Sequence, residues 1–447
     1  KDTLSLHDAL PIWFSQGGGV GLALAQWMVE GEPERDVFAM DVARFGDWIT
    51  PAYTRATVRQ TYQRRFSISY PNEELPAGRP HQTTPAYAVW DTQGAVFGHA
   101  YGMEAVNYFA PEGAPRHEIP SFRRSNAHDV VAAECRAVRE AVGINEVHNF
   151  GKYEVKGPRA EAWLDRIMAG RIPREGRMSL TPMLSPKGRL IGDFTVTRLG
   201  PEEFQLTSSY GARAFHMRWF ISHLEEGVEI RDISLERLGF QIAGPNAREL
   251  LGRVVRGNVS AEAFPFMAAR RVDIGTSRAI VQRVSYTGDL GYEIYVPAAG
   301  QIPLYQVIAA AGQDLGLRPF GMRAMMSLRL EKSFGSWLRE YGPDYMPCET
   351  GMDRFVKYDK PVDFIGKKAA IEEKKHGASR RLTTFVVEAE DADAVADEPI
   401  YCEGDLVGFC TSGGFAHWTG VSVAIGFLPV ELAATPQTVE IAILGER

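Results

Sequence analysis

Short runs in which apolar and polar residues alternate predict β-strands along much of this chain. The clearest run, LIGDFTVTRLG at residues 190–200, is rich in the β-branched and aromatic residues that strands favour, and Asp193 interrupts it. A carboxylate buried in a strand costs several kcal/mol of stability unless a partner or a proton neutralises it. Asp193 therefore predicts either an edge or solvent-facing position, or a residue with a chemical role.

The pattern changes along the chain. From about residue 114 to 317 strands alternate with helices, as where GKYEVKG is followed by PRAEAWLDRIMAG with Pro158 near the helix start, which predicts an α+β or α/β fold. The charged stretch IEEKKHGASRR at 371–381 predicts a linker or a solvated helix end. Beyond it, LTTFVVEAE, LVGFCTSGG and VSVAIGFLP are short strands separated by turns, typical of a β-barrel or sandwich.

A glycine run lies near the start of the chain. In WFSQGGGVGLALAQWMVEGEPERD we predict a Gly-rich turn followed by a helix that ends at Gly31 and Pro33. The turn would hold its backbone N–H groups at a helix N-terminus, where they could bind a phosphate or a flavin carbonyl, and a turn for tight packing is an equal alternative. Its glycines are Gly17, Gly18, Gly19 and Gly21.

Both ends of the chain are unusual. The sequence KDTLSLHDALPI begins with Lys rather than Met and joins abruptly to the glycine run, while TVEIAILGER at the other end is a strand followed by a turn signal. These features predict a fragment cut at both ends, with a non-native start. Residues 50–110 are rich in aromatic and loop residues, which favours a small connecting domain over a repeat.

Composition excludes several classes of protein. The 447 residues suffice for about three domains, and 45% of them are hydrophobic. A net charge of −7 gives no electrostatic footprint for nucleic acid or an anionic membrane. No apolar run approaches the ~20 residues of a membrane span and no signal peptide opens the chain, so we predict a soluble, cytoplasmic protein. The widely spaced Cys135, Cys348, Cys402 and Cys410 suggest neither disulfides nor zinc and fit a reducing compartment.

Common catalytic motifs are missing from the sequence. It contains no G-x-x-x-x-G-K-[ST], no G-x-S-x-G and no H-E-x-x-H, and its ten histidines have no metal-ligand spacing. We therefore predict no metal site, and the hydrolase, NTPase and zinc-enzyme classes lose most of their support.

Three stretches carry candidate chemistry. LTPMLSPKGRLIGDFTVTRL is a turn entering the strand with Asp193; VSYTGDLGYEIYVP is a strand, a turn and a second strand, with Tyr286 and Glu293; and RPFGMRAMMSLRLEKSF is a helix with Arg323 and Glu331. Each residue also has a structural explanation. Glu293 could be an exposed strand residue, Tyr286 a core aromatic, and Arg323 with Glu331 part of a surface ion network.

Six segments together resemble, in order and at similar spacing, the folate-binding aminomethyltransferase (T-protein) family of the glycine cleavage system. They are VREAVGINEVHNFGKYEVKGPRAEAWLDRIMAG, LTPMLSPKGRLIGDFTVTRL, SYTGDLGYEIYVP, FGMRAMMSLRLEKSFGSW, DFIGKKAA and GFCTSGGFAHWTGVSVAIGFLP. The chain is still more similar to the flavoenzymes that carry this module at their C-terminus, the dimethylglycine and sarcosine dehydrogenases. GGGVGLALAQWMVEGEPERDVFAMDVARFG resembles the last helix of their FAD-oxidoreductase domain, and residues 65–113 resemble their central domain.

The resemblance implies an α+β fold with three lobes around a central cavity, a small N-terminal connecting domain and a truncated C-terminal β-barrel domain. The implied segments are a probable non-native leader (1–15), a remnant of the FAD-dependent oxidoreductase domain (16–45), the FAD-oxidoreductase central domain (46–113), the folate-binding domain (114–375) and the C-terminal barrel domain (376–447).

The resemblance also implies roles for four residues. Asp193 matches an aspartate beside the N5/N10 edge of tetrahydrofolate, and Tyr286 matches an aromatic that lines the folate cavity. Glu293 and Arg323 match residues that hold the pterin and its surroundings. Asp193 would accept hydrogen bonds from the reduced-pterin and N10 protons, orient the folate amine, and offset cationic charge as that amine attacks an iminium or formaldehyde carbon. A carboxylate such as Glu293 can accept two N–H bonds from a 2-aminopyrimidine edge.

In the parent enzymes, flavin oxidation of an N-methyl amine yields a one-carbon unit that tetrahydrofolate traps as 5,10-methylenetetrahydrofolate. We expect this chain to carry out only the second step, the trapping of the one-carbon unit, with tetrahydrofolate as its cofactor. FAD would be confined to the full-length parent. LTSSYGARAF lacks an Asn typical of glycine-cleavage proteins, and GMRAMMSLRLE differs from their GARDSLRLE, which argues against a lipoyl carrier protein as partner. The amine and the oligomeric state stay open. Alternatives are a folate-binding module without catalysis, a structural module, or a stand-alone aminomethyltransferase-like protein.

Overall fold

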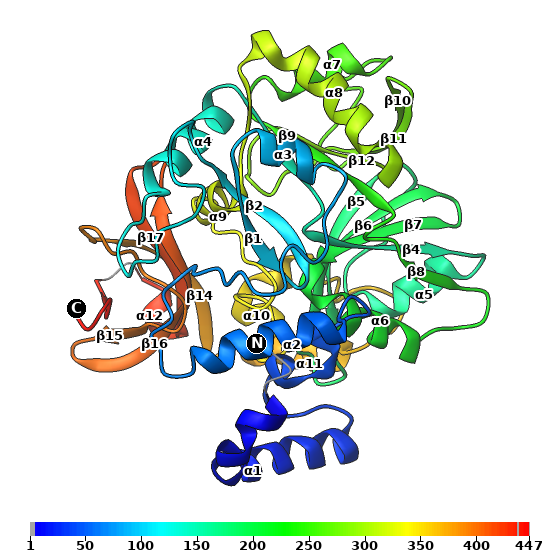
Figure 1. Ribbon diagram of the computed structural model, residues 1–447. Coiled ribbons are helices and arrows are strands. Elements are labelled where there is room, and N and C mark those ends of the chain that lie inside the picture. Colours follow the sequence, from blue (N-terminus) through cyan, green and yellow to red (C-terminus); the bar gives the residue numbers. More distant parts are fainter. Residues whose placement is uncertain (1–4, 436–437, 447) are drawn as a thin grey trace.

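The computed structural model describes residues 5–435 and 438–446, and it divides into three lobes, each built on one β-sheet (Figure 1). The first part of the predicted leader, residues 1–4, lies outside the described residues. A two-stranded hairpin precedes the lobes, formed by β1 (Ala95–Ala100) and β2 (Met103–Phe109). This architecture confirms the predicted three-lobed α+β fold with a small N-terminal connecting part.

The first lobe contains a six-stranded sheet in which only the pairing of β13 with β3 is parallel. Its strands, in spatial order, are β10 (Ala269–Ile274), β11 (Ser277–Gln282), β12 (Gly291–Pro297), β9 (Arg237–Ala243), β3 (Val142–Glu146) and β13 (Leu317–Pro319). Helices α7 (Ala247–Val254) and α8 (Gln301–Gly312) cover one face of this sheet, where Leu250 and Leu304 pack with Phe240 and Ile294 in one buried cluster.

The second lobe contains an antiparallel five-stranded sheet. Its strands, in spatial order, are β5 (Met178–Leu184), β6 (Leu190–Gly200), β7 (Glu203–Ser209), β4 (Phe150–Lys156) and β8 (Glu229–Asp232). Helices α5 (Ala160–Ile167) and α6 (Arg213–Ser222) cover its outer face, where Trp163 and Phe220 pack against Phe194 and Leu206. The strand predicted at residues 190–200 is therefore confirmed.

The third lobe contains an antiparallel sheet whose order is β14 (Arg380–Val387), β17 (Val421–Pro429), β16 (Asp405–Ala416), β15 (Pro399–Cys402) and β18 (Glu440–Ile441). The three strands predicted from LTTFVVEAE, LVGFCTSGG and VSVAIGFLP are β14, β16 and β17. Among the described residues, no pairing joins β14 to β18, so the barrel-like sheet stays open here. The charged stretch at 371–381 ends one helix and begins β14, as its helix-end interpretation predicted.

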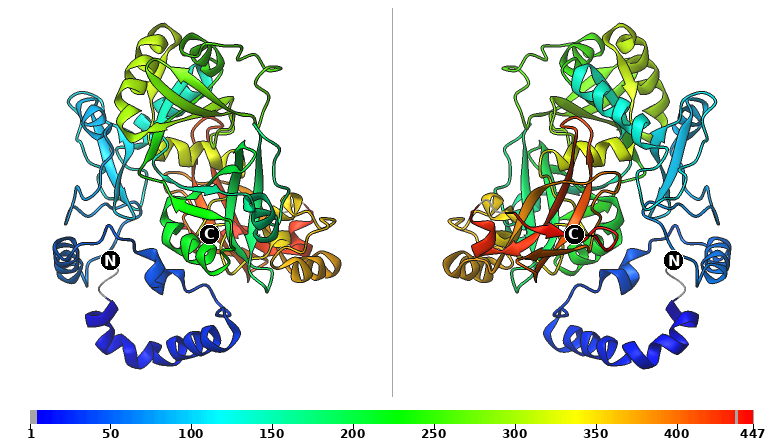
Figure 2. Two further views of the ribbon diagram at one scale, coloured as in Figure 1. Left: turned by 90° about the vertical axis from the view of Figure 1, so that its right-hand side faces the viewer. Right: turned by 90° about the vertical axis from the view of Figure 1, so that its left-hand side faces the viewer.

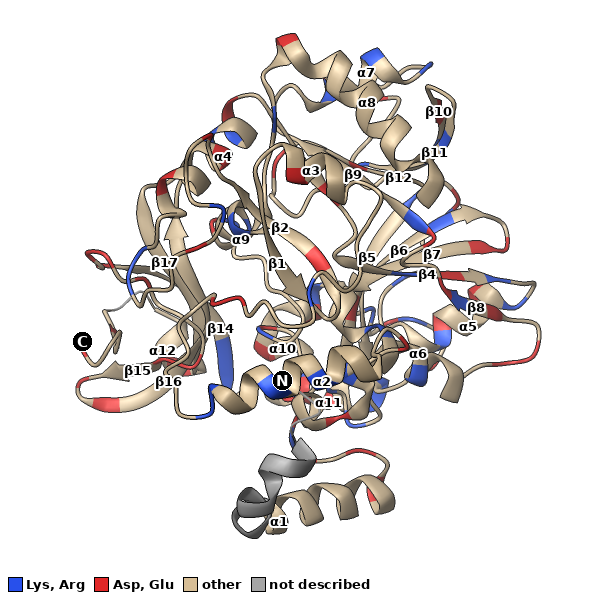
Figure 3. Ribbon diagram, in the orientation of Figure 1, with Lys and Arg blue, Asp and Glu red and all other residues tan. Residues whose placement is uncertain are grey.

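Helices connect and cover these sheets. They are α1 (Ser5–Glu30), α2 (Pro51–Gln63), α3 (Tyr87–Thr92), α4 (His128–Glu140), α5 (Ala160–Ile167), α6 (Arg213–Ser222), α7 (Ala247–Val254), α8 (Gln301–Gly312), α9 (Met322–Leu330), α10 (Pro347–Thr350), α11 (Lys367–His376) and α12 (Val430–Ala433). Among the described residues, no helix combines the length and the apolar character that crossing a bilayer requires. Lys and Arg are interspersed with Asp and Glu over all three lobes (Figure 3).

Two predicted local structures are wrong. Helix α1 runs straight through the glycine run and projects away from the lobes (Figure 2), so those glycines lie inside a helix rather than in a turn at its N-terminus. The helix does end at Gly31, whose φ of +83° suits glycine and whose N–H closes the last turn on the Trp27 carbonyl. The residues before the Thr-Gly-Asp turn are not a strand either, because β11 ends at Gln282 and Tyr286 lies in the turn itself.

Glycines inside α1 weaken it. A Cβ added at Gly18 or Gly19 would meet no atom within 4 Å, so packing does not require glycine there. We expect Gly18→Ala and Gly19→Ala to stabilise the helix by ~0.5–1 kcal/mol each, since alanine loses less backbone entropy on folding. Hydrogen exchange at the amides of residues 20–30 should become slower. Gly31→Ala is the control and should speed exchange, because alanine is strained at a positive φ. Unchanged exchange in the first two variants would contradict the assignment.

Candidate functional site

A row of buried polar side chains crosses the first sheet on the face opposite its helices. Along β12, Ile294 points to the α7 and α8 side, so its neighbour Glu293 points to the other face. The strand register places Glu293 beside Gln241 of β9 and Gln282 of β11, and Gln241 beside Asn145 of β3. All four side chains are buried. A sheet face that packs inside a protein is normally apolar, so this row calls for a polar partner.

The second sheet presents a matching polar face. Lys152 of β4, Thr207 of β7 and Thr195 of β6 are neighbours in register, on the face opposite the apolar residues that pack on α5 and α6. The Gln282 amide donates a hydrogen bond to the Thr197 hydroxyl (3.1 Å), which joins the two faces across the lobes. The two lobes therefore enclose a polar interior, which lies beside a small apolar cluster formed by Val147, Ile280 and Tyr295.

Several buried polar atoms in and around this interior have no hydrogen-bond partner among the described residues. They are Asp193 Oδ1, Gln241 Oε1, Gln282 Oε1, Asn149 Oδ1 and the ring nitrogens of His148, of which Nδ1 lies 3.5 Å from Glu146. Each such atom costs about 1–3 kcal/mol unless water or a ligand pairs with it. The interior thus offers polar atoms that a polar ligand or water could meet.

Glu293 lies inside this interior and is only 6% exposed, so its interpretation as an exposed strand residue is wrong. Its Oε2 accepts a 2.6 Å hydrogen bond from the Tyr295 hydroxyl. Burial raises the pKa of Glu293 to about 7, while the Tyr295 bond and the nearby Lys152 act to lower it. Lys152 is itself fully buried, and burial lowers its pKa to about 7.

Asp193 lies on the polar face of the second sheet, on strand β6. Strand β6 is flanked by β5 and β7, so the edge-strand explanation of Asp193 is wrong. Asp193 and Thr197 share one face of the strand, because their separation is an even number of residues. The Asp193 side chain is half-buried, yet its Oδ1 is enclosed and unpartnered. Loss of solvation raises the pKa of Asp193 to about 6.

Tyr286 lies near Asp193. Burial raises the pKa of Tyr286, and Arg329, Glu340 and Asp193 are all close enough to act on its hydroxyl. That hydroxyl donates a 2.7 Å bond to the Gly335 carbonyl, and the ring packs beside the cluster containing Phe320, as a core aromatic would. Asp193 also raises the pKa of Tyr341, whose own burial is the larger cause, to about 12.

Arg323 is not brought into this group. On α9, its guanidinium donates to Glu118 (3.0 Å) and to the Asn72 carbonyl (3.3 Å). Within the described residues it has no hydrogen bond or ion pair to Asp193, Tyr286 or Glu293. The predicted pairing with Glu331 is wrong as well, since Glu331 binds Arg139 (2.7 Å).

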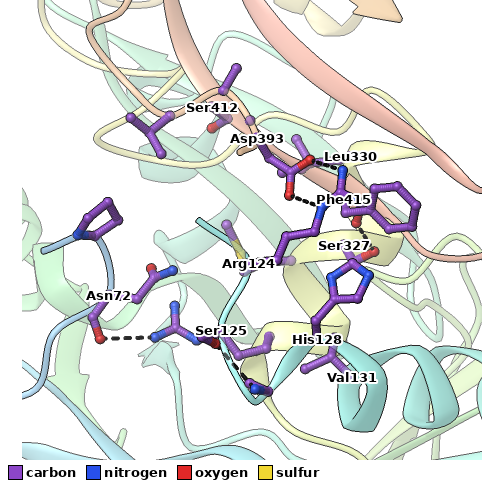
Figure 4. A pocket seen from close by; sticks show the side chains of 18 of the residues that line it. Asn72, Arg124, Ser125, His128, Val131, Ser327, Leu330, Asp393, Ser412 and Phe415 are labelled. Carbon is purple, nitrogen blue, oxygen red and sulfur yellow. Dashed lines mark hydrogen bonds and ion pairs between the residues drawn. The ribbon is translucent and has the colours of Figure 1, made fainter. Parts of the chain in front are cut away.

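Arg323 lines a separate pocket of about 600 Å³ between α4, α9 and β16. In this pocket Arg124 pairs with Asp393 and lies over the Phe415 ring, near His128 (Figure 4). Arg329 lines the same pocket and is close enough to act on Tyr286, so the pocket adjoins the surroundings of Asp193. No cluster of His, Cys, Asp and Glu suited to a metal ion occurs in the described part of the chain.

The sequence analysis missed much of this site. Lys152, Tyr295, Gln241 and Gln282 were given no role, although strand alternation could have found them. In GFQIA, for example, Gln241 lies between two core residues, Phe240 and Ile242, so a buried strand must carry it on its second face. A polar residue between two core residues of a strand that is covered on both faces is therefore the sequence signal that indicates a buried polar site.

Comparison with known proteins identifies the parts of the chain. Residues 86–360 match the GCVT N-terminal domain, residues 30–84 the FAD dependent oxidoreductase central domain, and residues 380–447 the glycine cleavage T-protein C-terminal barrel domain. The fold resembles the crystal structure of aminomethyltransferase T of the glycine cleavage system from Bartonella henselae, with a TM-score of 0.70, 21% identity and coverage of 81% of this chain and 94% of that one.

Two curated relatives are dehydrogenases of N-methylated glycines, as their names state. The chain is 36% identical to human mitochondrial dimethylglycine dehydrogenase, over 96% of this chain and 50% of the relative, and 30% identical to human mitochondrial sarcosine dehydrogenase, over 92% and 50%. It thus spans about half the length of the curated relatives it matches. The family models place the chain in the glycine cleavage T-protein family, with a preceding segment that matches the FAD dependent oxidoreductase central domain, and over nearly its whole length the chain is similar to dimethylglycine and sarcosine dehydrogenases.

Proposed function

We propose that this chain binds tetrahydrofolate in the polar interior between the first two sheets and that it promotes uptake of a one-carbon unit there, giving 5,10-methylenetetrahydrofolate. The observation that carries the proposal is Asp193, which lies on an internal strand with an enclosed carboxylate oxygen that no described residue binds. Membership of the family supports it, and the unpartnered Oε1 atoms of Gln241 and Gln282 are acceptors that the N–H groups of a ligand could meet.

When bound, tetrahydrofolate supplies the amine nitrogens that take up the one-carbon unit. Asp193, with a pKa of about 6, is largely ionised at neutral pH and can accept a proton from such an amine. Its negative charge also stabilises the cationic character that develops there. Trp337 and Tyr341 are buried near it and limit the access of water.

Glu293 and Arg323 have proposed binding roles. Glu293 would accept the N–H groups of the pterin edge, while Tyr286 would line the cavity. Arg323 would hold surrounding structure through Glu118 rather than touch the pterin, since α9 directs it to the neighbouring pocket.

The wider reaction is also a proposal. The full-length parent would oxidise an N-methyl amine with FAD, and these residues would serve the folate half, with no lipoyl carrier protein and no nucleic acid or membrane as partner. The relatives' names specify mitochondria, so the cytoplasmic location predicted from the sequence stays a prediction.

Folate binding is tested by calorimetric titration of folinic acid, a stable reduced folate. We expect micromolar affinity for the wild-type chain and a loss of about 10–100-fold in Glu293→Ala, because a charge-assisted contact contributes about 1.5–3 kcal/mol. Glu229→Ala, an exposed glutamate on β8, is the matched control and should bind normally.

The outcomes separate the candidate functions. No binding by a folded wild-type chain would favour a purely structural module. Binding without catalysis would favour a folate-binding module, and in that case folinic acid affinity and formaldehyde trapping would not depend on Asp193.

A further inference from the structure

Glu293 does not act alone in the polar interior. The Tyr295 hydroxyl donates to its Oε2 at 2.6 Å, and the Lys152 Nζ lies 5.9 Å from the centre of the Tyr295 ring. The side chains of Glu293, Tyr295 and Lys152 are buried, with exposed fractions of 6%, 1% and 0%, respectively. They come from two lobes, since Tyr295 and Glu293 share one face of β12 whereas Lys152 belongs to β4.

Lys152 is held in place independently of Glu293. Its ammonium donates to the Phe150 carbonyl (2.8 Å) and the Val147 carbonyl (3.1 Å). These bonds fix the Lys152 side chain near the carboxylate without a direct ion pair, so the carboxylate oxygens are not covered by the lysine. In its protonated form Lys152 supplies a positive charge there. A cation near a tyrosine ring also makes its hydroxyl a stronger donor.

We propose, building on the function proposed above, that Tyr295 and Lys152 are specificity-determining positioning residues that hold Glu293 ionised, so that the site selects the paired N–H donors of a 2-aminopyrimidine edge. An ionised carboxylate accepts hydrogen bonds only, whereas a protonated one would donate and would suit a ring edge with acceptors. The tyrosine hydroxyl keeps the carboxylate in one orientation, with the rest of its acceptor capacity available to a ligand.

Other charged groups surround Glu293, Tyr295 and Lys152 and also influence the pKa values of these residues. Arg237 of β9 acts on Tyr295, and Asp232 of β8, Arg213 of α6 and Glu146 of β3 act on Lys152. His148, after β3, is close to both Glu146 and Lys152, and burial lowers its pKa. The variants below leave all five of these groups in place.

The sign of the pH effect follows from the directions of the shifts. Burial raises the pKa of Glu293 to about 7, and both Tyr295 and Lys152 act against that rise. Removing either should therefore raise the pKa further, so that binding is lost at a higher pH. A rise of about one unit leaves about one tenth of Glu293 ionised at pH 7 in place of half, which weakens binding about five-fold, while at pH 9 both forms are almost fully ionised.

The test titrates folinic acid calorimetrically from pH 6 to pH 9 into the wild-type chain, Tyr295→Phe and Lys152→Met. We expect about five-fold weaker binding at pH 7 and affinity within two-fold of wild type at pH 9. Tyr292→Phe makes the same chemical change on the opposite face of β12, where its hydroxyl meets Arg248, and should leave the pH profile unchanged. An equal loss at pH 7 and pH 9, or an unshifted profile, would overturn the proposal.

A second measurement needs no ligand. Titration of the Glu293 carboxyl by ¹³C NMR in glutamate-labelled protein, assigned with Glu293→Gln, should move to higher pH in Tyr295→Phe. If wild-type protein fails to bind folinic acid at every pH, the proposed function fails, whereas an unshifted carboxyl titration refutes the role of Tyr295 alone.

Discussion

Asp193→Asn is expected to slow the formation of 5,10-methylenetetrahydrofolate from formaldehyde and tetrahydrofolate by about 10²–10⁴-fold, measured above the uncatalysed rate, since that is the usual contribution of a positioned proton acceptor. The wild-type rate should fall as pH decreases through about 6, because loss of solvation raises the Asp193 pKa to that value and the protonated form cannot accept a proton. The variant should lack this acidic limb. Asp273→Asn, at an exposed position of β10, is the matched control.

The same substitution should stabilise the fold. Because the folded-state pKa of Asp193 is raised, the folded chain binds more protons than the unfolded chain between about pH 4 and 6, and stability falls as pH rises through that window. A shift of the Asp193 pKa from 3.8 to about 6 lowers the free energy of unfolding by ~3 kcal/mol at pH 7. Asp193→Asn should restore this free energy, which would appear as a higher urea midpoint or slower unfolding in urea. A residue serving packing alone would give destabilisation, and an unchanged trapping rate would remove the role of Asp193.

Local sequence patterns predicted the strands well but not their neighbours. Alternation located β6 with its full extent, yet it could not say whether Asp193 lay at an edge, because the order β5-β6-β7-β4-β8 depends on long-range pairing. Glu293 looked like a possible surface residue for the same reason. Its burial depends on the second lobe, whose Lys152 approaches it from a strand more than a hundred positions away in the sequence.

The errors also have local causes. Glycines usually interrupt a helix, so the glycine run suggested a turn, but the apolar residues on either side continue a helical pattern through it. Tyr286 was placed on a strand because its flanking residues favour one, whereas the turn that follows β11 begins earlier and carries it toward Asp193. The resemblance groups Arg323 with the residues that hold the pterin and its surroundings; in the structure Arg323 contacts Glu118 from α9, and its role toward the pterin stays a prediction.

Breaking the buried ion pair between Arg329 and Glu340 should be the largest single loss of stability tested here. The two side chains are 1% and 0% exposed and 3.1 Å apart. Glu340→Gln leaves Arg329 as an uncompensated buried cation, which typically costs about 3–5 kcal/mol. A lower urea midpoint measures this effect, and Asp314→Asn, which breaks an exposed pair with Arg253, should leave the midpoint nearly unchanged.

This ion pair also connects the third lobe to the candidate site. Arg329 donates to Ser412 and Glu340 accepts from Thr411, both on β16, while Arg329 holds the Phe334 carbonyl beside Gly335, the acceptor of the Tyr286 hydroxyl. Glu340→Gln should therefore weaken folinic acid binding as well as stability. The double variant Arg329→Met/Glu340→Leu removes both charges and should recover most of the stability, because apolar side chains of similar size can replace a buried pair. If it recovers stability but not binding, the polar connection itself positions Tyr286; if it recovers both, packing suffices, and if neither recovers, the pair is not the cause of the loss.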